Sequence, residues 1–197
     1  IRDGDRILLL GDTLLEREVP YAWLETRMHE QFPDRKFSVR NLSYSADTPR
    51  GISRSVFDSV DKGWERLKEQ IAMVKPTVVI LGYGMASSLD FVGSPTDRMA
   101  EPRRTTEEKV ARLKKEFTAL VEYVKTLPAG GQEATAGNGV RLVFLSPLRH
   151  EDLRRTHPGF PDPTEHNSVL GAFSTAIKEL AAANGATYVS LQDVAAP

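Results

Sequence analysis

The stretch Arg6–Arg17, RILLLGDTLLER, decides the fold of this chain. Its apolar run has the length and the branched side chains of a buried strand, and the run stops abruptly at Gly11 and Asp12. A hydroxyl residue, Thr13, follows immediately. Ligands of open parallel sheets bind beyond the carboxyl ends of the strands. Thr13 is therefore either a nucleophile at a binding site or a residue that only caps the turn.

Four more apolar runs share these properties, because they are short, rich in Val, Ile and Leu, and free of polar alternation. Stripes of apolar residues at helical spacing separate them. This alternation predicts one domain, residues 1–197, with an α/β fold: a three-layer α/β/α sandwich around a five-stranded parallel flavodoxin-like sheet. The five expected strands are Arg6–Leu10, Phe37–Leu42, Thr77–Gly82, Arg141–Ser146 and Thr187–Leu191, and the helical stripes begin at Leu24, Trp64, Val110 and Val169.

Composition excludes several classes of function. The net charge is -1, and the basic residues are mixed with acidic ones, which argues against a nucleic-acid binder. The chain has no cysteine, so disulfides, thiolate metal sites and a cysteine nucleophile are excluded. No cluster of His, Asp and Glu has the spacing of metal ligands, and we expect neither a metal nor a cofactor.

No apolar run approaches the ~18 residues of a membrane span, so the sequence predicts a soluble chain. The sequence begins at Ile1 rather than Met, as it would after removal of a signal peptide or if it were cut from a longer protein. A secreted or periplasmic protein fits this beginning, although the sequence determines neither the compartment nor the oligomeric state.

Three blocks follow the first three expected strands: LLLGDTLLER, NLSYSADT and ILGYGMAS. In this order they resemble the SGNH (GDSL-type) hydrolase superfamily, whose members are serine esterases and lipases with a flavodoxin-like fold. The resemblance covers nearly the whole chain. It implies a small-molecule or carbohydrate ester as substrate and acyl transfer in two steps, in which a hydroxyl attacks the ester carbonyl while a histidine takes its proton. The family holds the oxyanion with the nucleophile's N–H, a glycine N–H and an asparagine amide.

The resemblance assigns roles to residues of this chain, with three substitutions. Thr13 stands at the position of the serine nucleophile, Ala46 at that of the glycine donor, and Ala86 at that of the asparagine. Asp12 is expected to accept hydrogen bonds from loop N–H groups. The remaining predicted binding residues lie beside Ala86, where a serine side chain would replace part of the lost donor; they are Gly84, Ser87 and Ser88.

The family's Asp-x-x-His block does not occur in the residues given, which end with VSLQDVAAP. His150 and His166 are the remaining candidates for the catalytic histidine. His150 follows the fourth expected strand, and in a flavodoxin-like sheet that strand lies two places from the first, roughly 10 Å away. Asp162 precedes His166 at a spacing one residue too long for the block, so we expect it to be a turn or capping residue. Arg17, Arg50 and Arg54 follow the first two strands. They would favour an anionic ligand if they surrounded the cleft, but we expect them on the solvated surface.

Two functions remain open at this point. The first is hydrolysis of an acyl or carbohydrate ester through Thr13. The second is binding without catalysis, by a relative that keeps the fold and the cleft and takes up a carbohydrate, an acyl ligand or a partner domain. The three substituted positions favour the second function, and the family resemblance favours the first.

Overall fold

A computed structural model describes residues 1–89, 104–131, 139–192 and 194. The strands are β1 (Arg6–Gly11), β2 (Ser38–Asn41), β3 (Val78–Gly82), β4 (Arg141–Leu145) and β5 (Thr187–Val189). The α-helices are α1 (Thr13–Glu16), α2 (Trp23–Gln31), α3 (Val60–Val74), α4 (Met85–Ser88), α5 (Thr106–Thr126) and α6 (Thr164–Asn184), and two short 3₁₀ helices are η1 (Ile52–Arg54) and η3 (Ala129–Gly131). The predicted alternation of strands and helices is confirmed. The last residues of the chain, 195–197, lie outside the described part.

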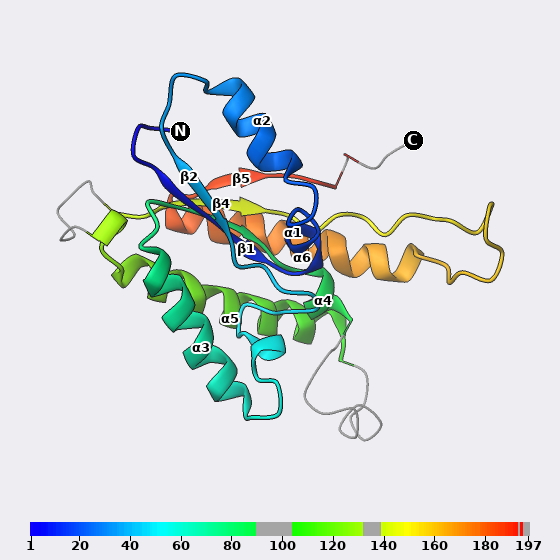
Figure 1. Ribbon diagram of the computed structural model, residues 1–197. Helices are drawn as coiled ribbons and strands as arrows, with labels where there is room; N and C mark the ends of the chain where they lie inside the picture. The colour runs from blue at the N-terminus through cyan, green and yellow to red at the C-terminus, as the bar shows by residue number, and fades with distance from the viewer. Residues whose placement is uncertain (90–103, 132–138, 193, 195–197) are drawn as a thin grey trace.

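The five strands form one parallel sheet in the order β2-β1-β3-β4-β5. Helices cover both faces of this sheet, α2 on one and α3, α5 and α6 on the other (Figure 1). The predicted three-layer α/β/α sandwich with a flavodoxin-like sheet is therefore confirmed. As expected, β4 lies two places from β1, and all five strands end at the same edge of the sheet.

The alternating side chains of β1 explain how the sheet joins two cores. Leu8 and Leu10 belong to the larger core, which contains buried residues of α3, α5 and α6. Ile7 and Leu9 belong to the smaller core, against which α2 packs. Because β1 is buried on both faces, its sequence shows an unbroken apolar run rather than alternation.

Helix and strand ends follow local signals. A capping box between Thr105 and Glu108 begins α5, and the left-handed Gly185 (φ 64°) ends α6 at the predicted position. Strand β5 ends at Val189, two residues before the predicted end. The reason is that the N–H of Leu191 donates to the side-chain Oγ of Ser146 at 2.7 Å and not to a backbone carbonyl of β4.

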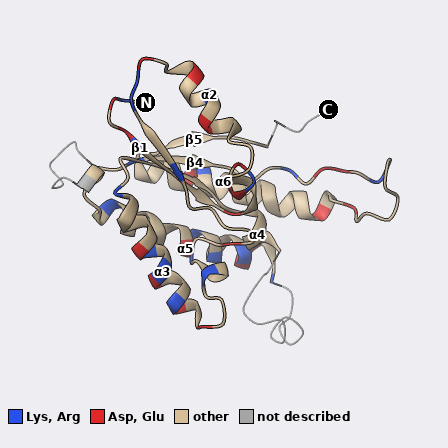
Figure 2. Ribbon diagram, viewed as in Figure 1, with Lys and Arg blue, Asp and Glu red and all other residues tan. Residues whose placement is uncertain are grey.

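Two observations concern the surface. Both α3 and α5 carry a mixture of basic and acidic residues (Figure 2). Within the described ranges, none of the helices is both long and apolar enough to cross a lipid bilayer.

Two glycines allow the ends of β1 and β3 to approach each other. Gly11 lies directly opposite Gly82 in the strand register. A Cβ atom on Gly11 would lie 2.3 Å from the carbonyl oxygen of Gly82, which is far inside van der Waals contact. The residues that follow these glycines are consequently brought close together at the carboxyl edge of the sheet.

We expect Gly11→Ala to lower the free energy of unfolding by about 3 kcal/mol or more, because the clash is with backbone that cannot move aside. The matched control is Gly171→Ala, in the middle of α6, where a Cβ meets nothing within 4 Å. That substitution should raise stability by about 0.5–1 kcal/mol through helix propensity. Urea unfolding of the two variants measures both effects, and a Gly11→Ala protein as stable as wild type would contradict the close approach.

Candidate functional site

Asp12 joins the loops that follow β1 and β3. Its side chain is buried, with 2% of the residue exposed, and Oδ2 accepts the N–H groups of Gly84 at 3.1 Å and Ala86 at 3.3 Å. Its Oδ1 accepts the N–H of Leu14 at 3.4 Å and so caps α1. Burial raises the pKa of Asp12 to about 6, although the backbone donors oppose this rise. Asp12 accepts loop N–H groups as expected.

Thr13 joins the loops that follow β1 and β2. It is the first residue of α1, and its Oγ1 accepts the N–H of Ala46 at 3.1 Å. Ala46 has a φ of 56°, in the left-handed region that glycine occupies most readily. The family resemblance places a glycine at this position, and the left-handed backbone explains that preference. Alanine keeps the N–H donor here but adopts a strained conformation.

A buried ion pair fixes the loop that carries Ala46. Asp47 is fully buried, and its Oδ2 accepts from Nε of Arg54 at 2.9 Å. Arg54 also donates to Oε1 of Gln70 at 2.5 Å and to the carbonyl oxygen of Leu42. The expectation that Arg54 lies on the solvated surface is therefore wrong, because only 6% of it is exposed. Its guanidinium donates to a backbone carbonyl of the loop and gives the buried Asp47 carboxylate, which also accepts the N–H of Ser53, a charged partner.

The residues around Ala86 contribute differently from the prediction. Ala86 is buried, and its N–H is taken by Asp12. Ser87 has a buried Oγ without a hydrogen-bond partner in the described residues. Ser88 is bonded to Met85 and His166. No described hydrogen bond connects either serine with Thr13, so their role as replacement donors stays a prediction.

The two candidate histidines lie together although they are far apart in the sequence. Nδ1 of His150 is 3.1 Å from Nδ1 of His166, and Nε2 of His166 is 2.6 Å from Oγ of Ser88. His150 follows β4, and His166 lies in the first turn of α6. Burial lowers the pKa of His166, and the nearby His150 and Lys109 lower it further. No described hydrogen bond links either ring to Thr13.

Asp162 has the structural role expected of it. Its Oδ1 accepts the N–H of Thr164 at 2.9 Å, at the beginning of α6, and its Oδ2 forms an ion pair with Arg154 at 2.6 Å. The carboxylate makes no described hydrogen bond to His166, so it does not orient that ring.

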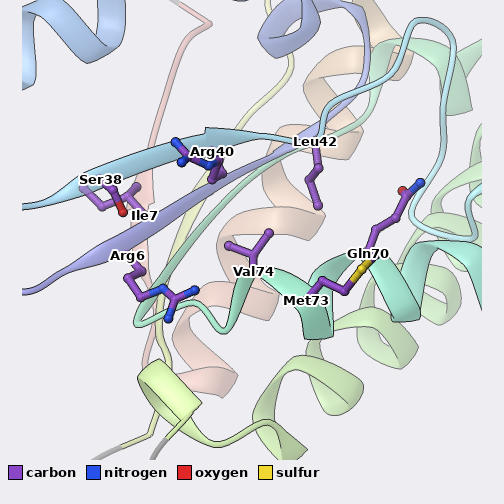
Figure 3. Close-up of a pocket in the computed structure, with 8 residues that line it drawn as sticks. All are labelled: Arg6, Ile7, Ser38, Arg40, Leu42, Gln70, Met73 and Val74. Atoms are coloured by element: carbon purple, nitrogen blue, oxygen red, sulfur yellow. The ribbon is translucent and has the colours of Figure 1, made fainter.

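One groove on the surface lies apart from Asp12, Thr13 and the two candidate histidines. Figure 3 shows a groove of about 310 Å³ between the edge strand β2 and α3, in which Arg40 and Leu42 lie opposite Met73 and Val74. None of its lining residues belongs to the Asp12, Thr13 or His150 groups. In the part of the chain that the structure describes, no group of three His, Cys, Asp or Glu residues is placed to hold a metal ion.

Comparison with solved structures identifies the class of fold. A gut microbial diltiazem-metabolizing enzyme matches with a TM-score of 0.66 at 16% identity over 98% of this chain, although the match spans only 38% of that enzyme. A catalytic mutant of an acetylxylan esterase from Geobacillus stearothermophilus matches with a TM-score of 0.64 at 17% identity, over 98% of this chain and 78% of that one. A lipase/acylhydrolase from Enterococcus faecalis matches with a TM-score of 0.55 at 15% identity, over the same shares of the two chains.

No protein-family model matches the sequence, and a search of curated proteins found no match. At such low identities the structural similarity establishes the fold alone. The chain has an SGNH hydrolase-like fold, and the similar structures include esterases and acylhydrolases. The family resemblance of the three sequence blocks is thus confirmed for the architecture that carries them.

The raised pKa of Asp12 predicts how stability changes with pH. Between the ordinary value of 3.8 and about 6, the folded protein binds more protons at Asp12 than the unfolded chain does. Asp12 therefore contributes its full stabilisation below the pKa of the unfolded state, 3.8. This contribution is lost as the pH rises through the pKa of the folded state, about 6. Relative to Asp12→Asn, wild type should gain about 1 kcal/mol of unfolding free energy between pH 7 and pH 5. Urea unfolding at the two pH values measures this gain, and equal changes in both proteins would contradict it.

The left-handed Ala46 predicts a stabilising substitution. Ala46→Gly should raise the free energy of unfolding by about 0.5–1 kcal/mol, because glycine relieves the strain and loses part of the gain to backbone entropy. Ala46→Val should lower it, since a branched residue fits this conformation poorly. Thermal unfolding of the pair tests this, and the opposite order of stability would show that the backbone at Ala46 is not left-handed.

Proposed function

We propose that this chain is an SGNH-type hydrolase that cleaves a small acyl or carbohydrate ester at the carboxyl edge of its sheet, with Thr13 as the nucleophile. The observation that carries the proposal is the hydrogen bond between Thr13 Oγ1 and the N–H of Ala46. It brings together the hydroxyl and the backbone donor that the resemblance assigns to the nucleophile and the oxyanion hole. The esterase and acylhydrolase activities named for similar structures support this choice of chemistry.

The proposed reaction needs a hydroxyl that can leave its resting hydrogen bond. As Oγ1 bonds to the ester carbonyl carbon, its proton passes to a base, and the carbonyl π electrons move onto the oxygen. The N–H groups of Thr13 and Ala46 then hold this oxyanion. The N–H of Thr13 is available, because it makes no hydrogen bond to a described residue. The alcohol leaves with a proton, and water releases the acyl group from Thr13 in the second step.

The proposed activity is weak compared with that of an enzyme with a full oxyanion hole. Ala86 has no side-chain donor, and Asp12 occupies its N–H. Loss of one oxyanion donor typically costs a factor of about 10²–10³ in rate. The γ-methyl of Thr13 further restricts rotation of the side chain.

The same observations support a second candidate, which is binding of the ester or carbohydrate without turnover. Asp12 takes the N–H groups of both Gly84 and Ala86, which leaves only two backbone donors for an oxyanion. A site of this kind would still accept a carbonyl oxygen in its ground state.

Two substitutions at Thr13 test the proposal. Thr13→Val keeps the shape of the side chain and removes the hydroxyl, so hydrolysis of p-nitrophenyl acetate should fall to the level of the buffer. Thr13→Ser keeps the hydroxyl and removes the methyl, so kcat should equal or exceed that of wild type. Equal rates for wild type and Thr13→Val would exclude Thr13 as the nucleophile. Binding of acetylated xylooligosaccharides by calorimetry, with no turnover, would instead establish the second candidate.

A further inference from the structure

Three side chains form a continuous chain of hydrogen bonds at the carboxyl edge of the sheet, beside the loop after β3. Oγ of Ser88 donates to the carbonyl oxygen of Met85 at 2.6 Å. The same Oγ lies 2.6 Å from Nε2 of His166, whose Nδ1 lies 3.1 Å from Nδ1 of His150. Ser88 is 2% exposed, so the Ser88 end of this series of hydrogen bonds is shielded from water and cannot reach a substrate.

The direction of these hydrogen bonds assigns the position of each proton. A serine hydroxyl has one proton, and because the carbonyl oxygen of Met85 can only accept, we assign that proton to this bond. The Oγ of Ser88 must therefore accept from His166, which places a proton on Nε2 of that ring. In neutral His166 the Nδ1 atom is then an acceptor, and the proton of the third bond belongs to Nδ1 of His150. Neutral His150 is left with a bare Nε2.

Several contacts hold this arrangement in place. The N–H of His150 donates to Oδ1 of Asn167 at 2.7 Å, and Nδ2 of Asn167 donates to the carbonyl oxygen of His150 at 2.9 Å. Lys109 donates to the carbonyl oxygen of Ser88 at 3.1 Å and places a positive charge near His166. The partial burial of His166, together with the charges of Lys109 and a protonated His150, favours its neutral form and therefore its role as an acceptor.

We infer that His150 is the general base of this site and that its Nε2 takes the proton of the attacking hydroxyl, while His166 and Ser88 act as positioning residues. The inference rests on the proposed function, since it supplies the base that the Thr13 reaction needs. A base whose other nitrogen donates to a third group is the arrangement that nucleophilic catalysis requires. In this chain a neutral imidazole takes the place that a carboxylate holds in the family.

The proton balance of this step is simple. The proton leaves Thr13 Oγ1 as that oxygen bonds to the carbonyl carbon, and it arrives at Nε2 of His150. The resulting imidazolium keeps its Nδ1–H, which still donates to His166, so no hydrogen bond of the chain is broken. The same Nε2–H then protonates the departing alcohol and returns His150 to its bare form. His150 follows β4, which lies two places from β1 in the parallel sheet, so His150 and Thr13 lie at the same edge, after strands roughly 10 Å apart.

Activity of substituted proteins tests the role of His150. His150→Gln should lower kcat for p-nitrophenyl acetate by about 10²–10⁴ with little change in KM. His166→Leu removes the acceptor and should lower kcat by up to about 10², whereas His166→Asn, whose Oδ1 can replace Nδ1, should recover part of this loss. The matched control is His157→Gln, because His157 lies in the same connection but is exposed, and its ring is hydrogen-bonded to Thr156 and stacked on Phe160, away from the His150–His166 pair. Its rate should equal that of wild type.

An NMR measurement of the imidazole nitrogens separates this inference from the proposed function. In wild type at about pH 8, where free imidazoles are neutral, His150 should show the Nδ1–H tautomer, and His166→Leu should shift it toward the Nε2–H form. Hydrolysis that requires Thr13 but survives His150→Gln would overturn the inference and leave the proposed function intact. An Nε2–H tautomer of His150 in wild type would also overturn it. Absence of any hydrolysis by wild type would overturn the proposed function and the role as a base, and the tautomer would still show whether the hydrogen-bonded chain exists.

Discussion

The buried carboxylate of Asp12 is the interaction on which the candidate site depends. It is the side chain that holds the loop after β3 against the loop after β1, through the N–H groups of Gly84 and Ala86. The carboxylate and the N–H groups depend on each other. A buried carboxylate without donors lowers the free energy of unfolding, and so do buried N–H groups without an acceptor. By capping α1, the same carboxylate also determines where that helix begins and hence how Thr13 faces the loop after β2.

The three loops meet where the sequence resemblance expects a site, although several residues there differ from those that the resemblance implies. The backbone donor at Ala46 survives in spite of a conformation that suits glycine, and the Asp47–Arg54 ion pair keeps its loop in place. The side-chain donor at Ala86 is lost. Histidines from two other elements, His150 and His166, lie on the same side of the sheet edge as the loop after β3. In this chain the fold brings the loops together even though the side chains there differ from those that the resemblance implies.

The architecture was accessible from sequence because burial on both faces leaves an unbroken apolar run, as in β1, and because helices show apolar residues at a regular spacing. The position of Asp12 as a loop acceptor followed from its place after β1. The contact between His150 and His166 was not predictable, since the residues are 16 apart on different elements and neither belongs to a motif. Arg54 was misplaced for a related reason. Its partner Asp47 lies in the same irregular loop, where no periodicity separates a buried side chain from an exposed one.

The facing glycines of β1 and β3 have a consequence for how such a protein diversifies. Gly11 leaves room for the backbone of Gly82, Gly82 leaves room for the side chain of Leu15, and Asp12 then bonds across the junction that they create. The two loops would therefore have to be engineered as one unit. A loop transplanted after β1 from a relative would fit only if both of its neighbours came with it. One is the loop after β3, which Asp12 holds, and the other is the loop after β2, whose Tyr44 and Ala46 N–H groups donate to Gly11 and Thr13.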